Sequence, residues 1–339
     1  MLSLLISMHL STKKIIGISL LILITFTSGL VVSPYLFTNA NQNITKEIRK
    51  NFNYQLINPL LECENSTISQ DKNLSSLKKS IEFIINQEVN NNKISFASVY
   101  YRDLNNGPWF GINEKEYFSP ASLIKVPVMM AYLRETEKNP GLLEKKIINT
   151  KAFDYSQQNI TPTQTLEQDK EYTINDLISR MIIYSDNAAY ELLLDNIDNM
   201  KIYDVYKDLD VDISKAQQDP NGNIITVKDY ASFFRILFNS SYLDQDNSEK
   251  ALTLLSKSQY YKGLVAGVPE NITIAHKFGE RQFLPSKEKQ LHDCGIIYLP
   301  GKPYLLCVMS RSSEFDQAAS FIKQVSNAVY NDLSKNQQK

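Results

Sequence analysis

Apolar residues follow several distinct patterns along the chain, and the first is an uncharged run near the N-terminus. Residues 15–37 read IIGISLLILITFTSGLVVSPYLF and contain no charged side chain. As a helix, a run of this length spans about 35 Å, which exceeds the roughly 30 Å hydrocarbon core of a bilayer. The apolar region of a cleaved signal peptide is usually shorter, about 7–15 residues. The pattern therefore predicts an uncleaved transmembrane anchor.

The anchor divides the chain into four expected parts. Residues 1–14 form a short cytoplasmic tail, 15–37 the transmembrane signal-anchor, 38–72 a polar stalk, and 73–339 the folded domain. Basic residues flank the anchor on both sides, so the charge bias that would orient it is weak. Because N-terminal anchors usually lead into export, we expect a single-pass membrane protein with its folded domain on the extracytoplasmic side.

Helical and strand patterns alternate in blocks within the folded domain. An amphipathic helix begins it, two strands joined by a turn at 105–108 follow, and the pattern is helical from about 121 to 255. A strand over 270–283, a hairpin that turns at Pro300-Gly301 and a C-terminal helix complete it. This order predicts an α+β fold, in which an antiparallel sheet is flanked by N- and C-terminal helices and carries an inserted all-helical lobe.

Composition and charge exclude several classes of function. The 339 residues are 43% hydrophobic and 22% charged, with a formal net charge of −1, so we expect no nucleic acid partner. The three cysteines form no C-x-x-C motif, and only His276 and His292 lie in the folded domain. We therefore expect no metal site and no cofactor. We also expect a monomer.

Candidate chemistry begins at Ser122 and Lys125. An S-x-x-K spacing places a hydroxyl and an amine one helical turn apart, and a neutral lysine can take the hydroxyl proton. The pattern occurs seven times, and any one of them could be a pair of polar helix positions. Only at Ser122 does it open an apolar helical run, FSPASLIKVPVMMAYL, with Pro120 near the first turn. Pro127 is expected inside this helix, an irregularity that is more common near functional sites than elsewhere.

Two further short motifs follow in sequence order. Ser185-Asp186-Asn187 lies between two apolar helical stretches, and Lys277-Phe278-Gly279 lies at the end of a strand pattern; each motif occurs once. Each also has a plain structural interpretation, as a helix N-cap and as a lysine on an edge strand. A Ser/His/Asp triad would need His276 or His292 and is not favoured.

Taken together, S-x-x-K, S-D-N and K-x-G resemble the signature set of class A β-lactamases and penicillin-binding proteins. The resemblance to this serine hydrolase superfamily covers about residues 74–335, including DLNNGPWFGINEKEYFSPASLIKVP and HDCGIIYLPGKPYLLCVMS. It implies a substrate that is a small-molecule β-lactam or a peptidoglycan peptide. It also requires that folding bring Ser122, Lys125, Ser185 and Lys277 into one cleft.

The resemblance assigns roles to the catalytic residues. Ser122 would attack a carbonyl and form an acyl-enzyme, with Lys125 as the base that takes its proton. Ser185 would pass a proton to the leaving nitrogen. Asp186 would be structural.

A second set of residues would bind the substrate. Asn187 would hydrogen-bond the substrate amide, and Lys277 would attract its carboxylate. The backbone N–H groups of Ser122 and Glu280 would form the oxyanion hole. The substrate-binding set is Asn187, Lys277, Gly279, Glu280 and Arg281.

The sequence departs from the family pattern at two places. Phe278 stands where the family has Ser or Thr, whose hydroxyl helps to bind the carboxylate, and Arg281 is the nearby candidate to replace it. No E-x-x-L-N follows the second motif, and Asp219, in a D-P-N-G sequence typical of a turn, is the only acid near the middle of that stretch. Without a deacylation base the acyl-enzyme would be long-lived.

Three functions therefore stay open. The first is a β-lactamase. The second is a D-Ala-D-Ala carboxypeptidase or other peptidoglycan peptidase with slow deacylation. The third, of another class, is a non-catalytic cell-wall or antibiotic-binding sensor.

Cys294 and Cys307 fall opposite each other if the hairpin pairs about Pro300-Gly301. Directly opposed cross-strand disulfides are often strained, so we expect two small buried thiols.

Overall fold

Five antiparallel strands form the central sheet, in the order β4–β3–β11–β10–β9. The turn between β3 and β4 and the turn between β10 and β11 contain Gly107 and Gly301, whose φ angles of 82° and 71° favour glycine. Both predicted hairpins are thus confirmed, and β9 is left at one edge. The strands are β3 (Phe96–Asp103), β4 (Trp109–Ile112), β9 (Ile274–Gln282), β10 (Lys289–Ile297) and β11 (Tyr304–Ser312).

This computed structural model describes residues 43–49, 54–67, 72–105, 107–214, 219–284 and 286–335. Within these ranges, no helix is both long enough and apolar enough to cross a bilayer. The predicted tail, 1–14, and the predicted anchor, 15–37, lie outside the described residues.

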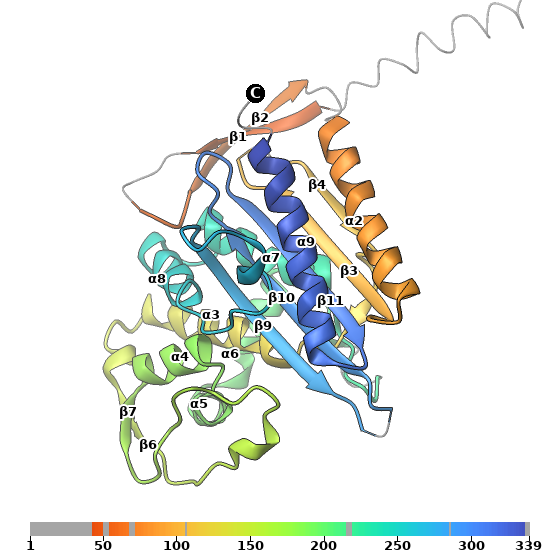
Figure 1. Cartoon of the computed structure of the whole chain (residues 1–339). Helices are drawn as coiled ribbons and strands as arrows, with labels where there is room; N and C mark the ends of the chain where they lie inside the picture. The colour runs from red at the N-terminus through yellow and green to blue at the C-terminus, as the bar shows by residue number, and fades with distance from the viewer. Residues whose placement is uncertain are drawn as a thin grey trace, which may run out of the picture. The chain divides into compact units, whose positions relative to one another are not determined.

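Two long helices cover one face of the sheet, as the sequence predicted. Helices α2 (Lys72–Asn90) and α9 (Phe315–Lys335) lie side by side over this face (Figure 1). Their apolar stripes pack with the strand residues that point to this face into one hydrophobic core, which includes Ile81, Val99, Leu306 and Ile322.

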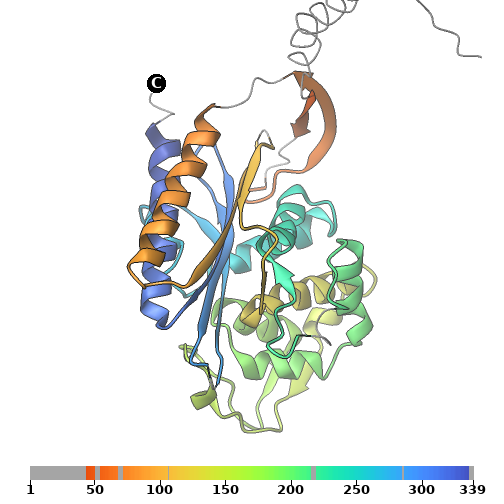
Figure 2. The same ribbon diagram turned by 90° about the vertical axis from the view of Figure 1, so that its right-hand side faces the viewer.

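The helical lobe lies on the opposite face of the sheet, as Figure 2 shows with the sheet seen nearly edge-on. It shares a second hydrophobic core with that face. Its α-helices are α3 (Lys125–Thr136), α4 (Ile174–Ile183), α5 (Asn187–Leu194), α6 (Asn199–Asp208), α7 (Val227–Asn239) and α8 (Gln245–Leu255). Its shorter elements, with those that border it, are β5 (Tyr117–Phe118), η1 (Ala121–Ile124), η2 (Leu142–Glu144), β6 (Lys146–Ile148), η3 (Tyr155–Gln157), β7 (Glu171–Thr173) and β8 (Ile225–Thr226). The short turn η5 (Val265–Gly267) instead packs against α9 on the other face of the sheet.

Side-chain caps set where the lobe helices begin. Thr173 and Asp176 form a reciprocal capping box at the start of α4. Thr226 accepts a hydrogen bond from the Asp229 N–H and so caps α7. Asp186 accepts from the N–H groups of Ala188 and Ala189, which confirms its structural role at α5.

Alternation along β9 decides which of its side chains reach the lobe. Ala275 belongs to the core shared with the lobe, whereas Ile274 and Phe278 belong to the core beneath α2 and α9. Because side chains alternate along a strand, Lys277 points toward the lobe. Its register partner Cys294 also belongs to the lobe-side core.

Cys294 and Cys307 are paired in register, as expected, but they are joined by a disulfide. The expectation of two free thiols was therefore wrong. The register places them directly opposite each other on the buried, lobe-facing side of the sheet, within bonding reach.

Residues 38–72, which the sequence assigned to a stalk, contain ordered structure in the ranges that are described. Strands β1 (Asn43–Arg49) and β2 (Leu60–Thr67) pair with each other. Gln55, Leu56 and Ile57 lie between these strands in the sequence. Their backbone N–H groups donate hydrogen bonds to the Glu249 carboxylate on α8 at 2.9–3.1 Å. The side chain of Ile57 is buried. The chain therefore docks on the lobe before α2 begins.

We expect Glu249→Gln to lower the free energy of unfolding by about 1.5–3 kcal/mol, because an NH2 group then replaces one of the two acceptor oxygens. Equilibrium urea denaturation measures the change. Glu191→Gln is the matched control, since Glu191 is exposed on α5. Equal losses in the two variants would show that the docking contact contributes nothing.

Candidate active site

Ser122 and Lys125 are adjacent in space because the chain changes helix type between them. Ser122 lies in the 3₁₀ turn η1, and Lys125 is the first residue of α3. In a 3₁₀ turn the side chains at i and i+3 eclipse, which places Lys125 Nζ 3.1 Å from Ser122 Oγ. Pro127 is therefore in the first turn of α3, where its missing N–H has no helical partner, and not in the helix interior as expected.

The turn between α4 and α5 brings the second motif to Lys125. Ser185 has a φ of 57°, a left-handed conformation that is costly for a residue other than glycine. Its Oγ lies 3.1 Å from Lys125 Nζ, and its carbonyl oxygen accepts from the same nitrogen at 2.7 Å. Asn187 Oδ1 accepts a further hydrogen bond from Lys125 at 2.6 Å.

Strand β9 supplies the third part of the site. Lys277 Nζ donates to Ser185 Oγ at 3.0 Å and to the carbonyl oxygen of Phe278 at 2.8 Å. Ser122, Lys125, Ser185 and Lys277 thus form one continuous chain of hydrogen bonds. Folding brings the four predicted groups together between the lobe and the edge of the sheet that β9 forms.

Burial controls the charge of the two amines. Lys125 is 1% exposed, and burial lowers its pKa from 10.5 to about 7, although Asp186 and Glu280 act to raise it. Burial also holds the pKa of Lys277 well below its usual value, and the charge of Lys125 lowers it further. An uncharged amine next to the Ser122 hydroxyl is therefore accessible near neutral pH.

The predicted substrate-binding residues of β9 have three different environments. Gly279 lies against η1: a Cβ there would be 2.9 Å from Leu123 Cγ and 3.0 Å from the Pro120 carbonyl oxygen. The Glu280 carboxylate accepts from Asn159 Nδ2 at 2.6 Å. Arg281 is exposed.

Arg281 nevertheless contacts the segment that precedes Ser122. Its Nη1 donates to Ser119 Oγ at 2.9 Å, three residues before Ser122, and its guanidinium lies over the ring of Phe283. A cationic side chain is thus held beside the segment that leads into η1.

Phe278 belongs to the packing on the far side of β9. Its side chain is buried and stacks on Tyr260, with ring centroids 4.2 Å apart. Lys277 Nζ lies 4.1 Å from the centroid of the same ring. Phe278 therefore contributes an apolar surface where the family pattern has a hydroxyl.

Neither histidine of the domain is hydrogen-bonded to Ser122. His292 Nε2 lies 3.0 Å from the Ser119 carbonyl oxygen, and burial lowers its pKa to about 3, so the ring stays neutral. His276 Nδ1 lies 2.8 Å from Asp293 Oδ1 in the interior. A Ser/His/Asp triad at Ser122 is absent from the described residues, in agreement with the sequence analysis. The described ranges also hold no cluster of His, Cys, Asp or Glu that suits a metal ion.

Sequence reasoning missed the segment 155–166, which we call the bracket loop. Tyr155 Oη donates to Asp186 Oδ1 at 3.2 Å, and the Gln158 side chain contacts the backbone of Ser185 and Asn187. Two residues after Gln158, the N–H of Ile160 donates to Glu280 Oε1 at 3.3 Å. The loop carries no motif, and its only sequence signal is a polar composition.

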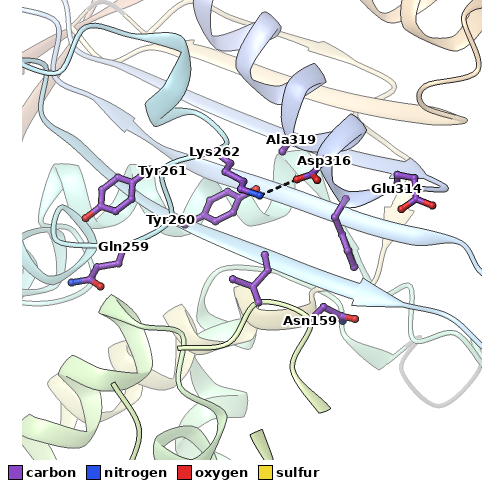
Figure 3. Close-up of a pocket in the computed structure, with 10 residues that line it drawn as sticks. Asn159, Gln259, Tyr260, Tyr261, Lys262, Glu314, Asp316 and Ala319 are labelled. Atoms are coloured by element: carbon purple, nitrogen blue, oxygen red, sulfur yellow. Dashed lines mark hydrogen bonds and ion pairs between the residues drawn. The ribbon is translucent and has the colours of Figure 1, made fainter. Parts of the chain in front are cut away.

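A cavity of about 670 Å³ lies beyond the bracket loop. Figure 3 shows side chains from the loop at 259–262 and from the start of α9 around it, including the 2.9 Å ion pair between Lys262 and Asp316. Its lining includes Asn159 and Ile160 but none of the four groups of the hydrogen-bonded chain. The Ser122 cluster therefore lies outside this cavity.

Comparisons with known proteins show the family and the fold of the chain. A model of the Beta-lactamase enzyme family matches residues 76–333. No curated protein sequence matches. The solved TLA-1 extended spectrum beta-lactamase has a TM-score of 0.66 at 20% identity, over 77% of this chain and 99% of that chain.

Two further solved structures are similar in fold. A class A beta-lactamase from Bacteroides cellulosilyticus has a TM-score of 0.65 at 19% identity, over 76% of this chain and 99% of its own. A PBP-A mutant, solved as an acyl-enzyme complex with penicillin G, has a TM-score of 0.63 at 20% identity, over 77% and 97%.

We expect Gly279→Ala to lower the free energy of unfolding by about 1–3 kcal/mol, because the added methyl group meets the backbone of η1. Chemical denaturation measures the loss. Gly141→Ala is the matched control, since a Cβ there meets only Asn139 Oδ1, at 3.9 Å. A Gly279→Ala protein as stable as the control would contradict the close packing of β9 on η1.

Proposed function

We propose that this chain, which belongs to the beta-lactamase enzyme family, is a serine hydrolase that forms an acyl-enzyme on Ser122. Its substrate would be a β-lactam or a related amide. The observation that carries the proposal is the hydrogen-bonded chain from Ser122 through Lys125 and Ser185 to Lys277. A nucleophile next to a buried amine with a pKa near 7 is the arrangement that base-assisted acylation needs.

Acylation uses these groups in sequence. The Ser122 hydroxyl proton moves to the lone pair of neutral Lys125 as Oγ bonds to the substrate carbonyl carbon, and the carbonyl electrons move onto oxygen. The N–H groups of Ser122 and Glu280 would stabilise that oxyanion. When the C–N bond breaks, the leaving nitrogen takes a proton from Ser185, which regains one from Lys125 across 3.1 Å.

Substrate orientation falls to the remaining polar groups. Asn187 lies within 2.6 Å of Lys125, so its amide is placed to meet a substrate amide next to the reacting carbonyl. A substrate carboxylate would be drawn to Lys277 and Arg281, because Phe278 offers no hydroxyl. Arg281 is exposed, and its contacts are one hydrogen bond to Ser119 and the ring of Phe283, so its guanidinium is placed where an anion can reach it.

Deacylation is the step with the fewest candidate catalytic groups among the described residues. Asp219, the acid that the sequence left as a candidate, accepts a hydrogen bond from the Asn221 N–H at 2.7 Å within its own turn. Neither Ser122 nor Lys125 is hydrogen-bonded to a carboxylate in the described part of the chain. This favours slow release of the acyl group, so a D-Ala-D-Ala carboxypeptidase or related peptidoglycan peptidase is the second candidate function.

The cellular location fits the same proposal. We propose a single-pass protein, anchored by residues 15–37, with the domain on the extracytoplasmic side. The disulfide between Cys294 and Cys307 supports this placement, since disulfides persist in oxidising compartments.

Labelled penicillin tests the nucleophile. We expect a covalent adduct on Ser122 of the purified protein, located by mass spectrometry, and no adduct in Ser122→Ala. Ser76→Ala is the matched control, because Ser76 begins an exposed S-x-x-K. An adduct that lasts for hours supports the peptidase, and release within seconds supports the β-lactamase. Folded wild-type protein that is never labelled would leave the sensor as the better interpretation.

The pH dependence of acylation tests Lys125. Its unprotonated form is the base, so the rate should rise with pH through about 7 and fall below it. Lys125→Met should slow acylation by about 10²–10⁴-fold at pH 8. Lys79→Met, at an exposed S-x-x-K lysine, should leave the rate unchanged. A rate that is flat from pH 6 to 8.5 would exclude Lys125 as the base.

A further inference from the structure

Gln158 is a nearly buried polar residue that lies outside the three motifs. Its side chain is 8% exposed and comes from the bracket loop, with its backbone N–H donating to the Tyr155 carbonyl oxygen at 3.1 Å. The side chain points at the turn that carries Ser185. A buried amide is costly unless its donor and acceptor are both used, and here they are.

The two ends of the Gln158 amide bind two peptide groups on either side of Asp186. Nε2 donates to the Ser185 carbonyl oxygen at 3.3 Å, and Oε1 accepts from the Asn187 N–H at 3.2 Å. The Gln158 side chain thus bonds both Ser185, which supplies a hydroxyl to the site, and Asn187, which supplies an amide. Both of these residues also contact Lys125.

The bond to Asn187 completes the cap of α5. The first N–H groups of a helix have no partner within it. Asp186 satisfies those of Ala188 and Ala189, and Gln158 satisfies that of Asn187. Hydrogen bonds from the bracket loop and from Asp186 therefore both fix the start of α5. They also fix the position of Asn187.

The bond to Ser185 restrains a strained backbone. Ser185 adopts a left-handed conformation, with a φ of 57°, which turns its hydroxyl toward both lysines. A residue in this region persists only where its surroundings fix it. Its carbonyl oxygen is held from two sides, by Lys125 at 2.7 Å and by Gln158 at 3.3 Å.

The shared carbonyl also connects Gln158 to the base. An oxygen that already accepts from the Gln158 amide attracts the Lys125 ammonium less strongly than one without that donor. Loss of the amide donor should therefore raise the pKa of Lys125 and reduce the fraction of neutral amine at a given pH.

We propose that Gln158 is a positioning residue for acylation. Its side chain holds the Ser185 carbonyl and the Asn187 N–H. These bonds place the Ser185 hydroxyl beside Lys125 and the Asn187 amide where it meets the substrate. The inference rests on the proposed function at Ser122. The two residues that directly follow Gln158 support it, because Glu280 accepts from Asn159 Nδ2 at 2.6 Å and from the Ile160 N–H at 3.3 Å. The bracket loop thus connects strand β9 with the turn that carries Ser185.

Gln158→Met tests the proposal, because methionine keeps the volume and removes both hydrogen bonds. We expect acylation by labelled penicillin to slow by about tenfold at pH 7, and the midpoint of its pH profile to move upward by about half a pH unit. Gln164→Met is the matched control: Gln164 lies in the same loop and is exposed, so its rate and midpoint should match wild type within about twofold.

A second variant covers the case in which Gln158→Met does not fold. Gln158→Glu keeps the acceptor for the Asn187 N–H, but it replaces the donor to Ser185 with a negatively charged oxygen. Because this negative charge favours the charged form of Lys125, the midpoint of the pH profile of acylation should move upward by more than it does in Gln158→Met. Circular dichroism and thermal melting establish that each variant is folded. A folded variant with the wild-type rate and midpoint would overturn the proposal, as would an equal loss in the Gln164→Met control.

A measurement without penicillin separates this inference from the proposed function. The pKa of Lys125 is followed by NMR on protein with ¹³C at lysine Cε, and Lys125→Met assigns the signal. An upward shift in the Gln158 variants, and none in Gln164→Met, supports the inference. An unchanged titration in both folded variants overturns it. Failure of wild-type protein to be acylated would instead count against the proposed function.

Discussion

The site depends on a lysine that is buried without a bonded counter-ion. Lys125 Nζ is surrounded by two hydroxyls, a carbonyl and an amide, and in the described residues its hydrogen bonds all go to uncharged oxygens. The two carboxylates that influence it have other partners: Asp186 caps α5 and accepts from Tyr155, and Glu280 holds the bracket loop. Because both acids are occupied elsewhere, burial outweighs their attraction and the amine titrates near neutral pH.

This constraint explains why the protein needs two structural layers around the site. The lobe supplies Ser122, Lys125 and the turn at Ser185, whereas the sheet supplies Lys277 from its edge strand. The groups meet because β9 packs tightly on η1 at Gly279, where a larger residue has no room. Burial lowers the pKa of Lys277, and the nearby charge of Lys125 lowers it further. A hydrophobic core packs on each face of the sheet around these groups.

Local strain and distant support occur together in this site. Ala121, just before Ser122, and Ser185 both have positive φ angles, which non-glycine residues adopt only where contacts compensate the cost. At Ser185 those contacts come from Lys125 and from the bracket loop, which in turn is fastened to Glu280. A short series of hydrogen bonds thus connects Ser122 with residues that are far from it in sequence.

The amino-acid sequence by itself determined the element order, the α+β class and the hairpins, because apolar periodicity and turn residues act over a few neighbouring positions. It also named Ser122, Lys125, Ser185, Asn187 and Lys277 as the groups to follow, since their spacing resembles a known motif set. Tertiary structure alone decided that Pro127 lies in the first turn of a helix, that Cys294 and Cys307 are bonded, and that Gln158 reaches the Ser185 turn. The reason is physical: the first group depends on local backbone preference, whereas burial, shared hydrogen bonds and the charge state of Lys125 depend on segments that meet only when the lobe packs on the sheet.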